Sequence, residues 1–516
     1  MKKKLILDGF SLTPRELSIF SRLALDPTVS WEIELSSEAR ERIVKSSQFI
    51  SKIVAKGDAV YGVNTGFGKF AQIRIDDQKL KLLQKNIILS HACGVGELLD
   101  RNIVFSMWIL RLNVIARGHS GIRLEIVDEI IKVLNLGIFS EIPSRGSVGA
   151  SGDLCPSAHA TLFFLGEGTC SYVHNGEIKR KEKVPAVQKL FQLTSVELGP
   201  KEGLSLINGT QLTTALAVQA WVETKKTLYH ANLSFLMLLE AIRASHSVLN
   251  PLLHQNKNQV GAQKIAEFAA QILQGTTEIS ESHVGCSKVQ DAYSIRCAPL
   301  VHGMVYDELA YAETILEREI NSSTDNPLIF PEEELSISGG NFHAMYPARM
   351  SDHLVTAMTT LANISERRIA SAMNPEQSGL STFLVPDGGL NSGFMMLQVT
   401  AAALVSEAKS LCYPASVDSI PTNNDQEDHV SMGPQAGFKA IEVLKKLKST
   451  IAIELMVAAQ GIDFLRPLKS SIALEKVHSR LREDVPFLEN DRFLAPDVEK
   501  IEELMEKGAF AEVLKK

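Results

Sequence analysis

The chain has 516 residues, of which 45% are hydrophobic and 22% charged, and its 53 basic and 60 acidic side chains give a net charge of −7. With 33 glycines and 19 prolines it is not a low-complexity or collagen-like polymer, and its composition is that of a folded globular protein. The weak charge and the lack of a long basic run argue against nucleic acid as the main partner, because phosphate binding needs clustered Lys and Arg. The length allows about three domains without requiring them.

Cysteine usage and the N-terminal segment indicate the compartment. The six cysteines are scattered and form no CxxC pair, which fits a reducing environment. The start has a basic head, but only three apolar residues precede Asp8, so the apolar core of a signal peptide is missing. No apolar run reaches about 18 residues. We therefore expect a soluble cytoplasmic protein that does not associate with a membrane.

Helical signals dominate the chain. A capping box at 13–16, with Pro14 at the first helical position, predicts a first helix, and Ser37 is predicted to cap a second helix that ends at Gly57. Apolar periodicity predicts four further helices, at 304–320, 353–373, 400–411 and 435–464. Pro496 marks the start of a short terminal helix.

Strand signals are few. Asn175-Gly176 lies between two short β-prone pieces and predicts one tight hairpin. No alternation of strands and helices suggests a parallel sheet. We therefore expect a mainly α fold with minor β-hairpins. It would consist of a smaller N-terminal lobe at 1–205 and a long-helix bundle at 206–516, which together form one cooperative unit.

Several segments are rich in Gly, Asn, Ser, His and Gln where a core would carry aliphatic side chains. They cover 61–68, 90–96, 146–153, 290–297 and 424–429, with shorter pieces at 206–211 and 339–343. Polar turns between long helices often carry binding groups. Each segment also has a structural interpretation, as a tight turn, a cap, a core histidine or a surface ion pair, and the residues alone leave both interpretations open.

Familiar cofactor templates do not match these segments. The glycines at 146, 149 and 152 fit neither the dinucleotide fingerprint nor the phosphate loop. The chain has no Gly-x-Ser-x-Gly elbow, no His-Glu-x-x-His and no close cluster of metal-ligating residues. We therefore expect no metal and no external cofactor.

The segments, in this order, resemble the histidine and aromatic amino-acid ammonia-lyase family from about Tyr61 to Asp497. The resemblance implies the ammonia-lyase type of helical fold and a homotetramer with shared active sites. It also implies that Ala150-Ser151-Gly152 makes its own cofactor. The Gly152 nitrogen attacks the carbonyl carbon of Ala150, and two dehydrations leave Ser151 as the exocyclic alkene of a 4-methylidene-imidazol-5-one (MIO). A backbone electrophile answers a need that no standard side chain meets.

The same resemblance assigns roles around the MIO. Tyr61 resembles the base that removes the β-proton of the substrate, for which a lowered phenol pKa is expected. Arg296 resembles the clamp on the substrate carboxylate. The residues that would surround the MIO and the substrate are Asn208, Gln290, Tyr293 and Phe342.

Two pairs bear on the choice of substrate. Ser90-His91 and Gln426-Glu427 are similar to the pairs of histidine-specific members. A carboxylate such as that of Glu427 can bind an imidazole but offers a phenyl ring nothing. The expected reaction is the conversion of L-histidine to trans-urocanate and ammonia, the first step of histidine degradation.

The sequence departs from the family pattern at Met345, Tyr346 and Leu300, which bear on rate and specificity. Two alternatives stay open. One is a tyrosine or phenylalanine ammonia-lyase or an aminomutase. The other is a helical scaffold that has kept the fold and lost the chemistry.

Overall fold

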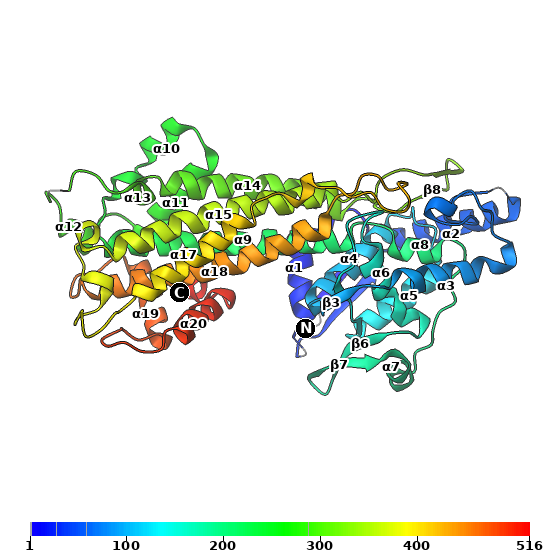
Figure 1. The fold of residues 1–516 in the computed structure, drawn as a ribbon, viewed down its shortest axis with the longest axis horizontal. Coiled ribbons are helices and arrows are strands. Elements are labelled where there is room, and N and C mark those ends of the chain that lie inside the picture. Colours follow the sequence, from blue (N-terminus) through cyan, green and yellow to red (C-terminus); the bar gives the residue numbers. More distant parts are fainter. Residues whose placement is uncertain (1–2, 27, 58, 287, 516) are drawn as a thin grey trace. The chain divides into compact units, whose positions relative to one another are not determined.

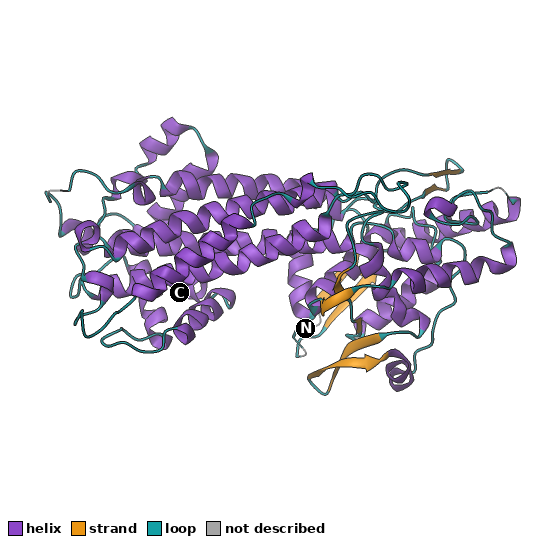
Figure 2. Cartoon of the chain, viewed as in Figure 1, coloured by secondary structure: helices purple, strands orange, loops and turns teal. Residues whose placement is uncertain are grey.

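The computed structural model describes residues 3–26, 28–57, 59–286 and 288–515. The chain forms two compact units, which are described separately. Unit 1 comprises 1–222, 313–352 and 414–438, and unit 2 comprises 223–312, 353–413 and 439–516. Helices predominate, and every described strand belongs to unit 1 (Figure 2).

Unit 1 contains short helices and four small sheets (Figure 1). Its helices are α1 (Pro14–Leu23), α2 (Ser37–Lys56), α3 (Leu80–His91), α4 (Arg101–Ala116), α5 (Leu124–Asn135), α6 (Leu154–Thr161), α7 (Val184–Phe191) and α8 (Glu202–Ile207). Its strands are β1 (Lys3–Leu7), β2 (Trp31–Leu35), β3 (Val95–Leu98), β4 (Phe139–Ser140), β5 (Pro143–Arg145), β6 (Thr169–His174), β7 (Glu177–Lys183), β8 (Leu328–Phe330) and β9 (Leu335–Ile337). β1 and β2 pair in parallel, whereas β3–β5, β4–β6–β7 and β8–β9 are antiparallel.

Unit 2 is built from helices (Figure 1). Those that lie wholly within it are α10 (Pro251–Lys257), α11 (Val260–Leu273), α12 (Glu278–Glu281), α13 (Tyr293–Arg296), α16 (Pro375–Ser378), α17 (Met395–Ser410), α19 (Ile472–Asp484), α20 (Ala495–Glu506) and α21 (Ala509–Lys515). The long helices α9 (Gln211–Ala241), α14 (Ala298–Ile320), α15 (Met345–Ala372) and α18 (Gly433–Asp463) contribute residues to both units.

Local signals predicted several element ends correctly. The capping box is present, because the Thr13 hydroxyl accepts the Glu16 N–H at 3.1 Å and the Glu16 carboxylate accepts the Thr13 N–H at 3.0 Å. The prediction for α2 was one residue late. Ser36, not Ser37, is its cap, since Ser36 has the extended backbone and its hydroxyl accepts the Ala39 N–H.

The predicted long helices are present, although α14, α15, α17 and α18 begin two to eight residues before their predicted starts. The predicted hairpin is β6–β7. No signal in the sequence predicted α9, whose 31 residues are almost all buried. A helix that is buried on every side has no polar face, so its sequence lacks the amphipathic pattern on which the prediction relied.

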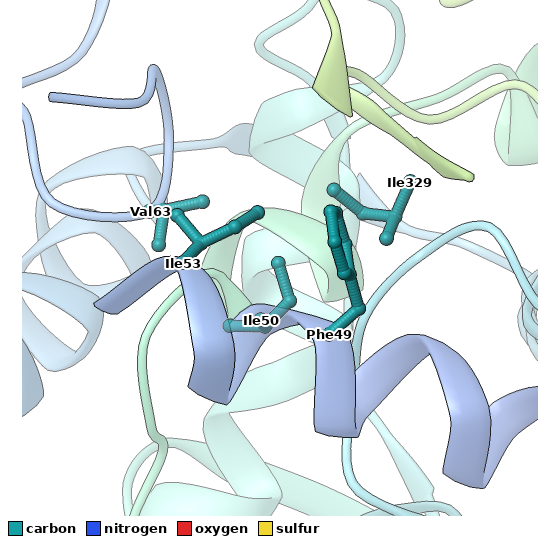
Figure 3. Packing of buried hydrophobic residues seen from close by; sticks show 5 residues of the cluster. All are labelled: Phe49, Ile50, Ile53, Val63 and Ile329. Carbon is teal, nitrogen blue, oxygen red and sulfur yellow. The ribbon is translucent and has the colours of Figure 1, made fainter. Parts of the chain in front are cut away.

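A small apolar cluster fixes the loop that carries the predicted base. Phe49, Ile50 and Ile53 on α2 pack with Val63 and with Ile329 on β8 (Figure 3). Val63 is fully buried and lies two residues after the base. The loop is therefore held by burial of an apolar side chain as well as by its turns.

A buried polar network joins the long helices inside unit 2. Arg368 on α15 and Glu454 on α18 are fully buried, and Arg368 Nη2 lies 2.9 Å from Glu454 Oε2. Glu454 also accepts the hydroxyl of Ser234 on α9 at 2.8 Å. Arg368 Nη1 lies 3.2 Å from Nε2 of His302 on α14, whose Nδ1 lies 2.7 Å from Asn232 Oδ1. Burial, and then the Arg368 charge, lower the pKa of His302, so its neutral ring accepts from Arg368.

Within the described ranges, no helix is both long and apolar enough to cross a lipid bilayer. That the chain unfolds as one cooperative unit stays a prediction.

The network predicts an uneven effect of two substitutions that each remove one positive charge. Arg368→Met should lower the free energy of unfolding by about 3–5 kcal/mol, because it leaves the Glu454 carboxylate buried without its cation. Lys264→Met on α11 is the matched control, since Lys264 and its partner Glu267 are both about half exposed. It should cost at most about 1 kcal/mol. Denaturant unfolding followed by circular dichroism measures both, and equal losses would contradict this account of the network.

Candidate functional site

Unit 1 contains a cavity of about 1400 Å³ whose wall includes most of the predicted site residues. Those that line it are Tyr61, Ser90, His91, Ala150, Ser151, Asn208, Phe342, Gln426 and Glu427. Gly152 is buried directly behind this wall. Segments separated by more than 360 residues in sequence therefore meet at one place in unit 1.

The segment at 146–153 forms a tight turn with left-handed backbone. Ser151 has φ 52° and Gly152 has φ 77°, and a Cβ at Gly152 would lie 2.3 Å from the carbonyl oxygen of Gly209. Only glycine fits at that position. The Gly152 N–H donates to the Gly149 carbonyl at 3.3 Å, which keeps this nitrogen on the inner side of the turn.

The turn is attached to the start of α9. Gly152 and Gly209 form a parallel bridge, and the Asp153 N–H donates to the Gly209 carbonyl at 2.7 Å. The Asp153 carboxylate accepts the N–H and the hydroxyl of Thr213 at 2.9 and 3.0 Å. Burial raises the pKa of Asp153 to about 6, although the Thr213 donors lower it.

Asn208 connects this attachment to the cavity. Its Nδ2 donates to the Ser151 carbonyl at 3.0 Å, and its backbone carbonyl accepts from the buried Arg111 at 2.7 Å. Arg111 also donates to the Gln211 side chain at 2.6 Å. The side-chain Oδ1 of Asn208 is buried and finds no hydrogen-bond partner among the described residues. Asn208 Nδ2 thus donates to the carbonyl that would become the ring oxygen of an MIO, so the residues that surround this segment fit that ring.

The predicted base lies at the same cavity. The Tyr61 hydroxyl accepts the Gly68 N–H at 3.5 Å. Burial raises the pKa of Tyr61, the Gly68 N–H lowers it, and the charge of Glu427 raises it further. This direction is opposite to the lowered pKa that the sequence analysis expected, because no cation is among the causes. The groups of unit 1 favour the neutral phenol.

The histidine-type pairs contribute a ring and a carboxylate. Ser90 Oγ lies 3.0 Å from His91 Nδ1 at the end of α3. Burial lowers the pKa of His91, whereas the Ile87 backbone and Glu427 raise it. The Glu427 carboxylate accepts the Ser151 hydroxyl at 3.0 Å. Its charge is thus felt by the predicted base, by His91 and by the MIO segment.

The other three predicted residues belong to unit 2 and are not among those that line this cavity. Gln290 and Tyr293 are exposed, and Arg296 donates from Nε to the Asp291 carbonyl at 2.9 Å. The Arg296 guanidinium lies over the Tyr293 ring, 4.9 Å from its centre. Gln290 and Arg296 line a separate cavity of about 710 Å³ within unit 2.

Sequence reasoning missed several residues that build the site. His343 and His429 stack at the cavity with ring centres 5.4 Å apart, and Arg111 and Thr213 hold the turn from behind. The histidines were visible only as members of polar segments. Arg111 lies in an apolar helix, where a charged side chain is itself the signal of a buried partner. Among the described residues no group of three His, Cys, Asp or Glu is arranged to hold a metal.

Comparison with known proteins defines the class. A family model for aromatic amino acid lyases matches residues 21–483, so the chain belongs to the aromatic amino acid lyase family, whose members are carbon–nitrogen lyases.

Particular relatives are histidine ammonia-lyases. The one from Idiomarina loihiensis is 44% identical over 94% of both chains, and the one from Caenorhabditis elegans is 43% identical over 99% of this chain and 75% of that protein. The crystal structure of histidine ammonia-lyase from Trypanosoma cruzi matches with a TM-score of 0.90 at 42% identity, over 99% of this chain and 95% of that one. The expected mainly α fold of the ammonia-lyase type is thereby confirmed.

A half-buried carboxyl near the turn gives a pH prediction. The Glu319 carboxylate accepts the Thr210 hydroxyl at 2.7 Å, and burial raises its pKa to about 7. The folded pKa of Glu319 exceeds its unfolded value of about 4.3. The contribution of this one group to the free energy of unfolding is therefore largest at low pH and is lost as the pH rises through 7. Glu319→Gln should therefore gain about 1–3 kcal/mol relative to wild type between pH 5 and pH 8.

Thermal unfolding at the two pH values measures the change. Glu317→Gln, on the exposed face of the same helix, is the control and should differ from wild type equally at both. A constant difference for Glu319→Gln would contradict the raised pKa.

Proposed function

We propose that the chain eliminates ammonia from L-histidine to give trans-urocanate. One observation supports this most strongly: the Glu427 carboxylate, which can bind an imidazole, lies at the same cavity as the predicted base and within hydrogen-bond distance of the Ser151 hydroxyl. The relatives that bear the name histidine ammonia-lyase over nearly the whole chain support the same substrate. A carboxylate at this position disfavours a phenyl or phenol ring, because its desolvation would not be compensated.

We propose that Ala150, Ser151 and Gly152 form the MIO. The left-handed turn, the inward Gly152 nitrogen and the hydrogen bond from Asn208 Nδ2 to the Ser151 carbonyl support this assignment. When formed, the MIO supplies the electrophile that makes the elimination possible. Asn208 orients the ring through the Ser151 carbonyl, and Arg111 orients Asn208.

Substrate binding would combine two sets of side chains. Glu427 and His91, which both line the cavity, hold the imidazole of the substrate. Arg296 binds the substrate carboxylate through its planar pair of donors. Since Arg296, Tyr293 and Gln290 do not line the unit 1 cavity, we propose that another copy of the chain supplies them in a homotetramer with shared sites.

Proton removal is assigned to Tyr61. A phenol with a raised pKa is a poor base at neutral pH, so it needs a cation nearby when substrate is bound. Arg296 from the neighbouring copy supplies that charge in the proposed assembly. The compartment we propose is the cytoplasm, where the six thiols, all free in the structure, stay reduced.

Removal of one oxygen tests the base. Tyr61→Phe should lower kcat by at least about 10²-fold, the smaller value typical of loss of a general base, while the MIO absorbance is kept. Tyr172→Phe in β6 is the matched control and should retain turnover. Urocanate formation followed in the ultraviolet measures both, and full turnover by Tyr61→Phe would remove it from the base role.

A substrate panel tests the assignment of L-histidine. The value of kcat/KM for L-histidine should exceed those for L-tyrosine and L-phenylalanine by about 10²-fold or more, since a carboxylate that the substrate desolvates rejects a ring that cannot bind it. Ultraviolet detection of the unsaturated acids measures all three. Equal or faster turnover of L-tyrosine would support the tyrosine-specific alternative.

A further inference from the structure

In the structure without substrate, Glu427 contacts the Ser151 side chain, whose hydroxyl would be lost when the proposed MIO forms. Ser151 Oγ donates to Glu427 Oε1 at 3.0 Å, and no other hydrogen bond of this hydroxyl occurs among the described residues. The contact exists in the open polypeptide, which is the precursor of the MIO. The contact can therefore act in the formation of the ring, separately from any role in substrate binding.

The Glu427 carboxylate is held for this contact by its own loop. Its second oxygen accepts the Thr422 hydroxyl at 2.7 Å, and the backbones of the two residues exchange hydrogen bonds at 3.0 and 3.3 Å. Between them Asn423, Asn424 and Asp425 all have left-handed backbone, with φ of 53°, 51° and 60°. A loop with this much unusual backbone persists only where its surroundings fix it.

Two contacts of the following segment fix it to the MIO turn. The Met432 N–H donates to the Val148 carbonyl at 2.9 Å, and Gln435 Nε2 donates to the Ser147 carbonyl at 2.8 Å. The approach is close, because a Cβ at Gly149 would lie 2.2 Å from the hydroxyl of Ser431. The carboxylate and the serine hydroxyl thus belong to two segments that are joined beside their point of contact.

Neighbouring carboxyls are engaged elsewhere. Asp153, two residues after Ser151, accepts both donors of Thr213, and Glu319 accepts the hydroxyl of Thr210. Asp428 also lines the cavity, but among the described carboxyls it is Glu427 that hydrogen-bonds Ser151 Oγ. Glu427 is therefore placed to exchange a proton with this oxygen.

We propose that Glu427 is the catalytic acid of the second dehydration that makes the MIO, a role that rests on the proposed function. Hydroxide is a poor leaving group, so the hydroxyl must receive a proton as it leaves, and a donor at 2.6–3.2 Å meets that need. The Glu427 carboxylate removes the Cα proton of Ser151, and the electron pair of the Cα–H bond forms the Cα=Cβ bond. The carboxyl gives that proton to Ser151 Oγ as the Cβ–Oγ bond breaks, and water leaves. The carboxylate is regenerated, and the net change is the loss of one water.

Intact mass tests this role without any measurement of turnover. Wild type made by cell-free synthesis should reach a mass about 36 Da below that of its polypeptide, which corresponds to two waters. Glu427→Gln should keep the Ser151 oxygen and lose at most about 18 Da over the same time. Asp428→Asn is the matched control, because it makes the same change one residue further along at the same cavity. It should lose the full two waters.

A milder variant covers the case in which Glu427→Gln does not fold, which circular dichroism would reveal. Thr422→Val keeps the Glu427 carboxylate and removes the hydrogen bond that the Thr422 hydroxyl donates to it. This variant should lose the second water more slowly than wild type. The role of Glu427 would be overturned if Glu427→Gln lost both waters at the wild-type rate. If Glu427→Gln is unfolded, loss of both waters by Thr422→Val at the wild-type rate would overturn it instead. A wild-type protein that loses no water would instead overturn the proposed function and this role with it.

Discussion

The short backbone bridge between Gly152 and Gly209 is the constraint on which the site depends. It holds the segment 150–152 against the start of α9, where the close carbonyl of Gly209 leaves no room for a Cβ at residue 152. The left-handed backbone of Ser151 is an unfavourable conformation for a residue with a side chain, so it persists because the flanking contacts of Asp153 impose it. For the proposed ring closure, a turn held in this way would limit the motion of the Gly152 nitrogen and the Ala150 carbonyl before any reaction begins.

Buried polar contacts support this constraint at a distance from the cavity. Within the described part of the chain, Arg111 hydrogen-bonds no carboxylate and instead donates to backbone carbonyls and to an amide oxygen, so its charge serves to orient the residues around Asn208. Burial lowers its pKa to about 10, which still leaves it charged at neutral pH. Lys201 and Asp325 add a fully buried ion pair in the same unit. A buried ion pair contributes little net free energy to folding, but removal of one partner leaves a buried charge and strongly destabilises the fold. The backbone is therefore held in the arrangement that keeps the pair together.

Two kinds of feature could be predicted from the sequence: elements set by short-range signals, and site residues implied by the resemblance to the family. The capping box before α1 and the hairpin at Asn175-Gly176 are short-range signals, and both are present. The order of the polar segments revealed the resemblance to the family, and nine of the site residues that it implied line one cavity. The contact of Asp153 with Thr213 spans 60 residues and that of Arg111 with Asn208 spans 97, so no local pattern predicts them. Nor does segment order reveal that residues 414–438, which include Glu427, belong to the same unit as Tyr61.

The central claim is that this turn becomes a ring, and the mass of one proteolytic fragment tests it most directly. Cleavage after Arg145 and after Lys179 releases residues 146–179, which contain the whole turn. The fragment from purified wild-type protein should weigh about 36 Da less than its sequence requires, and fragmentation should assign the missing waters to residues 150–152. A fragment with the full mass of the open polypeptide would contradict the account.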